Sequence, residues 1–198
     1  MRLTYRCASS TVFTVLAFLF AVSDLAGCKS KEQQQRIEAN RFYPHVEEYG
    51  QIVDQSLSRP PAARFNGFEG GVITLTSLGY LGTSGKLGYT LNLSFLSLPP
   101  GLKPTSPADV RTIVTIECHR QVIGSYVDEA THLGGIAKAY QMQCTLTPID
   151  AAKGVRLTQH LVFGPTPPDK TYNNNNGYGA DISYEQLADS IVELSSNR

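Results

Sequence analysis

The chain has 198 residues, a formal net charge of zero, 41% hydrophobic residues and 17% charged residues. This length favours one globular domain. The neutral balance lacks the clustered basic surface of nucleic-acid-binding proteins, so we expect no nucleic-acid partner. The 17 glycines and 11 prolines indicate many turns between short strands.

The N-terminus has the organisation of an export signal. Arg2 and Arg6 precede an apolar run of eleven residues, 12–22, and the small residues Ala26 and Gly27 follow. The run is shorter than the roughly 20 residues that a membrane-spanning helix needs. A basic start, a short apolar centre and a small-residue end are typical of a signal peptide. A buried helix or a short membrane anchor is the alternative.

The tetrapeptide Leu25, Ala26, Gly27 and Cys28 resembles the lipobox of bacterial lipoproteins. The resemblance implies cleavage between Gly27 and Cys28, a diacylglycerol thioether on Cys28, and acylation of its new amino group with a fatty acid such as palmitate. One acyl chain binds membranes only marginally, whereas a multiply acylated cysteine anchors stably. We therefore expect residues 1–27 to be a removed signal peptide and Cys28 to attach the protein to a membrane.

The expected organisation of the mature chain follows from these residues. Residues 28–43 form the lipidated N-terminus and a tether, because 29–36 contain no apolar side chain to bury; the first turns of a helix are the alternative. Residues 44–198 form a single α+β domain. Lys29 stands where an Asp resembles an inner-membrane retention signal, which favours the outer membrane, with the domain facing the periplasm or the cell exterior.

Two helices are predicted at the ends of this domain. The C-terminal helix starts at Ser183, which has capping-box spacing to Gln186, while Ile182 and Leu187 form a hydrophobic staple. The N-terminal helix starts near Pro44. Its apolar stripe comprises Val46, Tyr49, Val53 and Leu57.

Between the helices, alternating side chains and turn-rich stretches predict about five strands. The expected strands are 72–76, 87–98, 110–118, 136–146 and 155–163. Short turns between consecutive strands predict an antiparallel meander. The fold class is therefore α+β: an antiparallel β-meander flanked by an N-terminal and a C-terminal helix, with both helices on one sheet face.

Cys118 and Cys144 are the cysteines that remain once Cys7 leaves with the signal peptide and Cys28 is acylated. Both lie in strand patterns, and an exported domain meets oxidising conditions. Placing them directly opposite each other pairs Ile116 with Leu146, Val122 with Tyr140, Tyr126 with Ile136, and Arg120 with Met142. Because the cysteines and the apolar pairs require the same register, we predict a cross-strand disulfide.

No catalytic residue, metal or cofactor is predicted. Cys118 and His119 are adjacent on a strand, so their side chains point to opposite faces and cannot form a nucleophile–base pair. Residues 81–86 do not form a phosphate-binding loop, because Tyr80 stands in place of its first Gly and Leu87 in place of its Ser or Thr. The histidines lack metal-ligand spacing; they are His45, His119, His132 and His160.

One unusual loop, residues 171–181, is the candidate ligand-binding segment. Tyr172, Asn174, Asn175 and Tyr178 offer amides and rings that would hydrogen-bond and stack on a sugar or a peptide; a low-complexity loop is the alternative. We expect a non-catalytic, lipid-anchored envelope protein that binds an envelope protein or a glycan. The competing hypothesis is an envelope hydrolase whose active site the sequence does not reveal.

Overall fold

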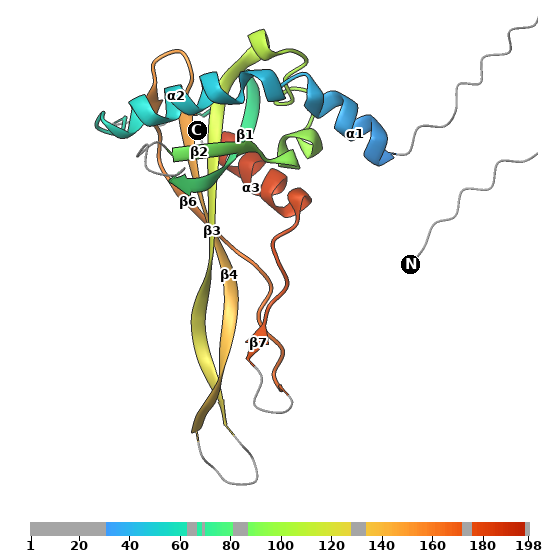
Figure 1. Ribbon diagram of the computed structural model, residues 1–198, viewed down its shortest axis with the longest axis vertical. Coiled ribbons are helices and arrows are strands. Elements are labelled where there is room, and N and C mark those ends of the chain that lie inside the picture. Colours follow the sequence, from blue (N-terminus) through green and yellow to red (C-terminus); the bar gives the residue numbers. More distant parts are fainter. Residues whose placement is uncertain are drawn as a thin grey trace, which may run out of the picture.

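A computed structural model describes residues 31–62, 67–68, 70–80, 87–127, 134–171 and 176–196. A head of sheet and helices carries a long two-stranded hairpin that projects away from it (Figure 1). The helices are α1 (Lys31–Asn40), α2 (Val46–Leu57) and α3 (Tyr184–Ser196), with short 3₁₀ helices η1 (Tyr43–His45), η3 (Leu93–Ser97) and η4 (Pro107–Asp109). Among the described residues, no helix is long and apolar enough to cross a membrane.

One mixed sheet forms the centre of the head and continues into the projecting hairpin. Its strands are β1 (Gly71–Tyr80), β2 (Leu87–Leu91), β3 (Val110–Val127), β4 (Gly134–Asp150), β5 (Val155–Arg156), β6 (His160–Phe163) and β7 (Gly177–Tyr178). The strand order is β2-β1-β3-β4-β5, and β6 and β7 also pair with β4.

The sheet is not a purely antiparallel meander, because β1 and β3 run parallel. β2 forms an antiparallel pair with one edge of β1, so the chain crosses over and adds β3 to the other edge. Strand direction alternates along the chain, and β3 therefore has the direction of β1. The mixed α/β content with an N-terminal and a C-terminal helix agrees with the predicted class.

The strand expected over 87–98 ends at Leu91, and η3 follows it. The side chain of Asn92 accepts a hydrogen bond from the Ser94 N–H at 3.0 Å, which caps the start of η3. Thr74 donates its hydroxyl proton to the Asn92 carbonyl at 2.6 Å. These bonds turn the chain into a 3₁₀ helix, and Phe95 enters the core fully buried.

The helices lie on both faces of the sheet, not on one. Tyr89 and Leu91 share the β2 face over which α2 packs, and the Tyr89 hydroxyl donates to Asp54 of α2 at 3.0 Å. η3 lies against the opposite face, because the Ser94 hydroxyl bonds to Thr74. α3 packs on η3, so the head has three layers.

The capping box of α3 is confirmed. The Gln186 N–H donates to the Ser183 hydroxyl at 3.1 Å, and the Ser183 N–H donates to the Gln186 side-chain oxygen at 2.9 Å. On α2, Tyr49 and Val53 are buried as expected, while Leu57 at the end of the helix is exposed.

Packing begins before residue 44. Residues 31–40, within the segment expected to be a tether, form α1. Phe42 is buried and its ring contacts that of Phe95 edge-on, with centroids 5.2 Å apart. Lys103 also forms an ion pair with Glu38 of α1 at 2.6 Å. The head therefore includes residues N-terminal to the expected domain boundary.

Candidate functional site

The most distinctive feature of the molecule is the projecting hairpin, here called the arm: residues 117–127 of β3 and 134–143 of β4 (Figure 1). The pairing of β1 with β3 ends at Ile116, so the arm leaves the head there. Eleven residues of β3 at about 3.3 Å each give it a reach of about 35 Å. In the described part of the chain, no strand pairs with β3 of the arm on the side away from β4.

The predicted disulfide closes the base of the arm. Cys118 and Cys144 are bonded and lie directly opposite each other, with their Cα atoms 4.1 Å apart. Cys144 is fully buried in the core of the head, whereas Cys118 is exposed. The bond thus ties the start of the arm to the core.

The predicted register holds at three of its four side-chain pairs. Ile116 with Leu146, Arg120 with Met142, and Val122 with Tyr140 are paired as expected.

The fourth pair is wrong by one residue. Tyr126 faces Ala137 instead of Ile136, because a β-bulge lies between Val122 and Gly124. Ile123 is the extra residue of this bulge. Bulges commonly re-aim side chains at sheet edges, and here both Val122 and Ile123 are nearly half exposed.

An aromatic cluster with a cation lies beside the bulge. The ring of Tyr178 stacks on that of Tyr140, with centroids 5.1 Å apart and planes within 13°. The guanidinium carbon of Arg120 lies 4.8 Å from the Tyr178 ring centroid, which is cation–π geometry. Of the candidate loop residues, Tyr178 thus packs against the arm; Tyr172, Asn174 and Asn175 lie outside the described residues.

The outer edge of β4 is covered by a strap, defined as residues 164–171 and 176–183. β7 belongs to the strap and pairs parallel with β4 at Tyr140. The Tyr126 hydroxyl donates to the Pro168 carbonyl at 2.6 Å. Gly177 is required beneath this ring, since a Cβ there would lie 2.0 Å from the Tyr126 hydroxyl oxygen. The strap therefore protects one edge of the arm and leaves the β3 edge open.

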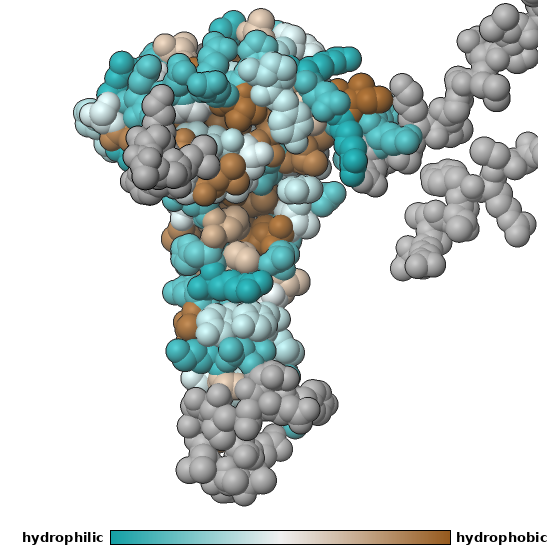
Figure 2. All heavy atoms as spheres, in the orientation of Figure 1, coloured by the Kyte–Doolittle hydropathy of each residue, from teal (hydrophilic) through white to brown (hydrophobic). Residues whose placement is uncertain are grey.

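Exposed apolar side chains line the arm and the strands beside it. On the face shown in Figure 2, hydrophobic side chains gather at the base of the arm, and hydrophilic ones predominate farther along it. The exposed large apolar residues in this region are Val122, Ile123, Val127, Leu161, Phe163 and Tyr178. Exposed apolar side chains grouped on one projection indicate an interaction surface.

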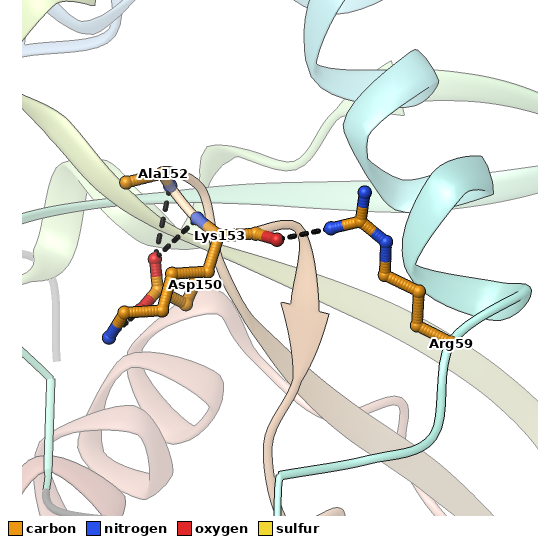
Figure 3. Close-up of polar contacts among 4 residues, drawn as sticks. All are labelled: Arg59, Asp150, Ala152 and Lys153. Carbon is orange, nitrogen blue, oxygen red and sulfur yellow. Dashed lines mark hydrogen bonds and ion pairs between the residues drawn. The ribbon is translucent and has the colours of Figure 1, made fainter.

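A cleft with a volume of about 520 Å³ lies on the head. The turn at its rim is held by Asp150, whose carboxylate accepts the backbone N–H groups of Ala152 and Lys153, both at 3.0 Å (Figure 3). The Lys153 ammonium lies 3.0 Å from the same carboxylate, and Arg59 donates to the Lys153 carbonyl.

The charge state of this turn follows from those contacts. Partial burial raises the pKa of the Asp150 carboxyl, but the hydrogen bonds and the charge of Lys153 outweigh it, so the pKa lies below its ordinary value. The polar groups of the turn bond to one another. The described lining residues include Thr112, Arg111 and the Asp150–Lys153 turn, and none of them is Ser, Cys or His.

The histidines do not converge on a metal site in the part of the chain that the structure describes, where no three His, Cys, Asp or Glu residues are grouped to hold an ion. His45 contacts Glu48 at 3.2 Å, His119 lies on the arm, and His160 lies on β6. His132 falls outside the described residues.

The sequence patterns did not identify three arm residues as candidate binding residues: Arg120, Ile123 and Tyr140. One signal was present: residues 118–127 and 134–144 contain no Asp or Glu. No protein-family model, curated protein or solved structure matches the chain.

Proposed function

We propose that the chain is a lipid-anchored protein of the bacterial envelope that binds a partner protein through the arm, without catalysing a reaction. The anchor rests on Leu25 to Cys28 and the signal-like residues before them. The binding role rests on a single observation: the arm projects from the head with exposed apolar side chains and one open strand edge.

The construction of the arm supports a binding role. An isolated two-stranded hairpin is marginally stable in water. This one is reinforced by the disulfide Cys118–Cys144, by the stacked rings of Tyr140 and Tyr178, and by the strap. Such reinforcement keeps exposed side chains in a fixed arrangement, which lowers the entropic cost of binding a partner.

The expected lipid anchor on Cys28 allows little distance between the membrane and the head. Two residues separate Cys28 from the start of α1 at Lys31. Even fully extended, this connection spans about 10 Å. The head would therefore stay close to the lipid surface, and the arm would supply most of the distance to a partner.

The binding role is tested by site-specific photo-crosslinking in cells that make the acylated protein. A photoreactive residue at position 122 on the arm is expected to give a discrete adduct with one protein. The same residue at the exposed position Glu193 on α3 is the control and is expected to give none. Equal adduct patterns at the two positions would contradict binding through the arm.

The anchor is tested separately by Cys28→Ala. The wild-type protein is expected in the membrane fraction, and the variant as an unacylated precursor of higher mass. Cys7→Ala is the matched control, because Cys7 would leave with the signal peptide. Identical mass and partitioning of the wild type and Cys28→Ala would refute the anchor.

A further inference from the structure

We infer that the exposed face of α1 binds the phosphate-bearing headgroups of an anionic bilayer, so that the head lies on the membrane and the arm points away from it. This inference rests on the proposed anchor at Cys28 and adds a second, non-covalent contact to it. Three observations carry it: the shortness of the link between Cys28 and α1, the side chains on the exposed face of α1, and the pocket beside Arg41.

The link to the lipid determines which part of the head comes nearest to the bilayer. Two residues separate Cys28 from Lys31, so the first turn of α1 lies within about 10 Å of the Cys28 backbone. On the head, α1 is remote from the tip of the arm (Figure 1). A helix tethered this closely meets headgroups at a high effective concentration, so a modest affinity of one face for lipid is sufficient to orient the head.

The exposed face of α1, taken with Arg41 directly after the helix, offers hydrogen-bond donors around one apolar side chain. Its described residues are Gln33, Gln34, Arg36, Ile37, Asn40 and Arg41. None of them is acidic, and all but the isoleucine carry N–H donors, whereas the phosphate oxygens of a headgroup are acceptors. Asn40 and Arg41 follow Ile37 by three and four residues and so adjoin it on the helix surface.

The two acids of α1 lie away from this face. Glu38 is partly buried and forms the ion pair with Lys103 at 2.6 Å. Glu32 is seven residues before the buried Ala39, and seven residues are close to two whole turns, so Glu32 lies on the side of α1 that faces the head. The exposed face is therefore free of the carboxylates that would repel a phosphate.

The end of the head that includes α1 also has an excess of bases. Residues 31–45 and 99–106 contain four Lys and Arg residues and two acids. The next acids along the chain, Glu47 and Glu48, belong to α2. Each Lys or Arg near an anionic surface strengthens attachment about five-fold, so this excess favours the orientation in which α1 lies on the bilayer.

A pocket of about 280 Å³ adjoins the exposed face at the end of α1. Phe42 and Leu96 line it together with Arg41, Lys103 and Glu38. Glu38 holds the Lys103 ammonium, whereas Arg41 makes no ion pair in the part of the chain that the structure describes. A guanidinium can bind phosphate oxygens through two parallel hydrogen bonds, so Arg41 is the residue that we expect to bind a headgroup.

Two other occupants of this face are disfavoured. A partner protein would compete with headgroups that the two-residue link keeps beside α1. A second copy anchored in the same bilayer would bring two ends with an excess of bases together, and like charges repel across an interface.

Site-directed spin labelling of the acylated full chain in vesicles tests the inference. Ile37→Cys places a label on α1, and Glu193→Cys places the control label at an exposed position of α3. The vesicles are phosphatidylcholine, with or without about 30% phosphatidylglycerol. In anionic vesicles we expect the label at position 37 to be shielded from a water-soluble nickel chelate at least about five-fold more than the label at position 193.

Two variants separate charge from proximity. Arg41→Gln is expected to reduce the shielding at position 37 about five-fold in anionic vesicles, whereas Arg120→Gln, the same charge change on the arm, leaves it unchanged. A flexible spacer of about ten Gly and Ser residues between Ser30 and Lys31 loosens the tether. The shielding is expected to persist with this spacer, because the face itself binds headgroups, and to fall at about 0.5 M salt.

Several outcomes would overturn the inference: equal shielding at positions 37 and 193, equal shielding at position 37 in neutral and anionic vesicles, or no effect of Arg41→Gln. Loss of the shielding with the spacer would show that proximity alone places α1 and would overturn it as well. Shielding that disappears as the protein is diluted in lipid would assign the face to a second copy, with the same consequence.

The failure of this inference is distinguishable from the failure of the proposed function. If the acylated protein is bound to membranes while position 37 stays accessible to the chelate, the anchor stands and the lipid contact of α1 fails. If Cys28→Ala has the mass and partitioning of the wild type, the anchor fails and this inference fails with it.

Discussion

The head and the arm share the strand β3 but are stabilised in different ways. In the head, residues 112–116 are buried on both sides, because α2 covers one sheet face and η3 with α3 covers the other. In the arm, residues 117–125 of the same strand are exposed. The head is held by apolar burial, and the arm by a covalent bond, a ring stack and a strap. Substitutions in the two regions should therefore have very different effects.

The largest expected effect is in the core of the head. Phe95→Ala removes a fully buried ring that packs against Phe42, and we expect a loss of about 3–5 kcal/mol in the free energy of unfolding. Phe163→Ala, on the exposed face of β6, is the matched control, with a change below about 0.5 kcal/mol. Denaturant-induced unfolding measures both, and equal losses would contradict the division between the two regions.

The next effect is at the junction of head and arm. The double variant Cys118→Ala with Cys144→Ala is expected to lose about 3 kcal/mol, as the chain-entropy model gives for a loop of this size. Exchange of the arm amides should accelerate more than exchange of the β1 amides, because the head keeps its other contacts. Uniform acceleration across the sheet would show that the disulfide does not serve the arm in particular.

A smaller effect, confined to the head, is expected at the start of α3. Ser183→Ala removes the hydroxyl that accepts the Gln186 N–H and should cost about 1 kcal/mol. Ser190→Ala is the control, because that hydroxyl donates to a carbonyl within the same helix and caps nothing. Thermal unfolding of both variants gives the comparison, and an equal shift of Tm would argue against the capping box.

The smallest effect concerns the turn at the head cleft and depends on pH. The pKa of Asp150 is lowered in the folded state, so its carboxylate stabilises the protein above the unfolded pKa of 3.8 and loses this contribution as the pH falls through the lowered value. We expect Asp150→Asn to be less stable than the wild type at pH 6 and the difference to shrink on acidification. A difference that grew on acidification would reverse the sign of this assignment.

Local and self-consistent patterns predicted part of this fold correctly. The capping box depends on residues three apart, and the register of the disulfide hairpin was fixed by two patterns that agreed. The parallel pairing of β1 with β3 could not be predicted, because alternation within a strand does not specify its neighbour. The 3₁₀ helix η3 was predicted as a strand because Leu93 and Phe95 continue the alternation of Leu87, Tyr89 and Leu91.

The arm shows a second limit of the sequence patterns. Alternation in β3 and β4 indicates which side chains share a face, but it does not indicate whether anything covers that face. The bulge at Ile123 left no local signal strong enough to shift the predicted partner of Tyr126 from Ile136 to Ala137. The sequence shows that residues 118–127 and 134–144 lack acidic side chains, but only the structure shows that these residues project from the head (Figure 1).

The mixed topology of the sheet also orders the steps of folding. The antiparallel pair β3–β4 joins Cys118 to Cys144, 26 positions apart, whereas the parallel pair joins Ile73 of β1 to Ile113 of β3 across an intervening strand and crossover. Because contacts between distant residues form slowly, we expect the hairpin to be in place, and its cysteines already oxidised, when β1 docks. The arm would then act as the template on which the head assembles.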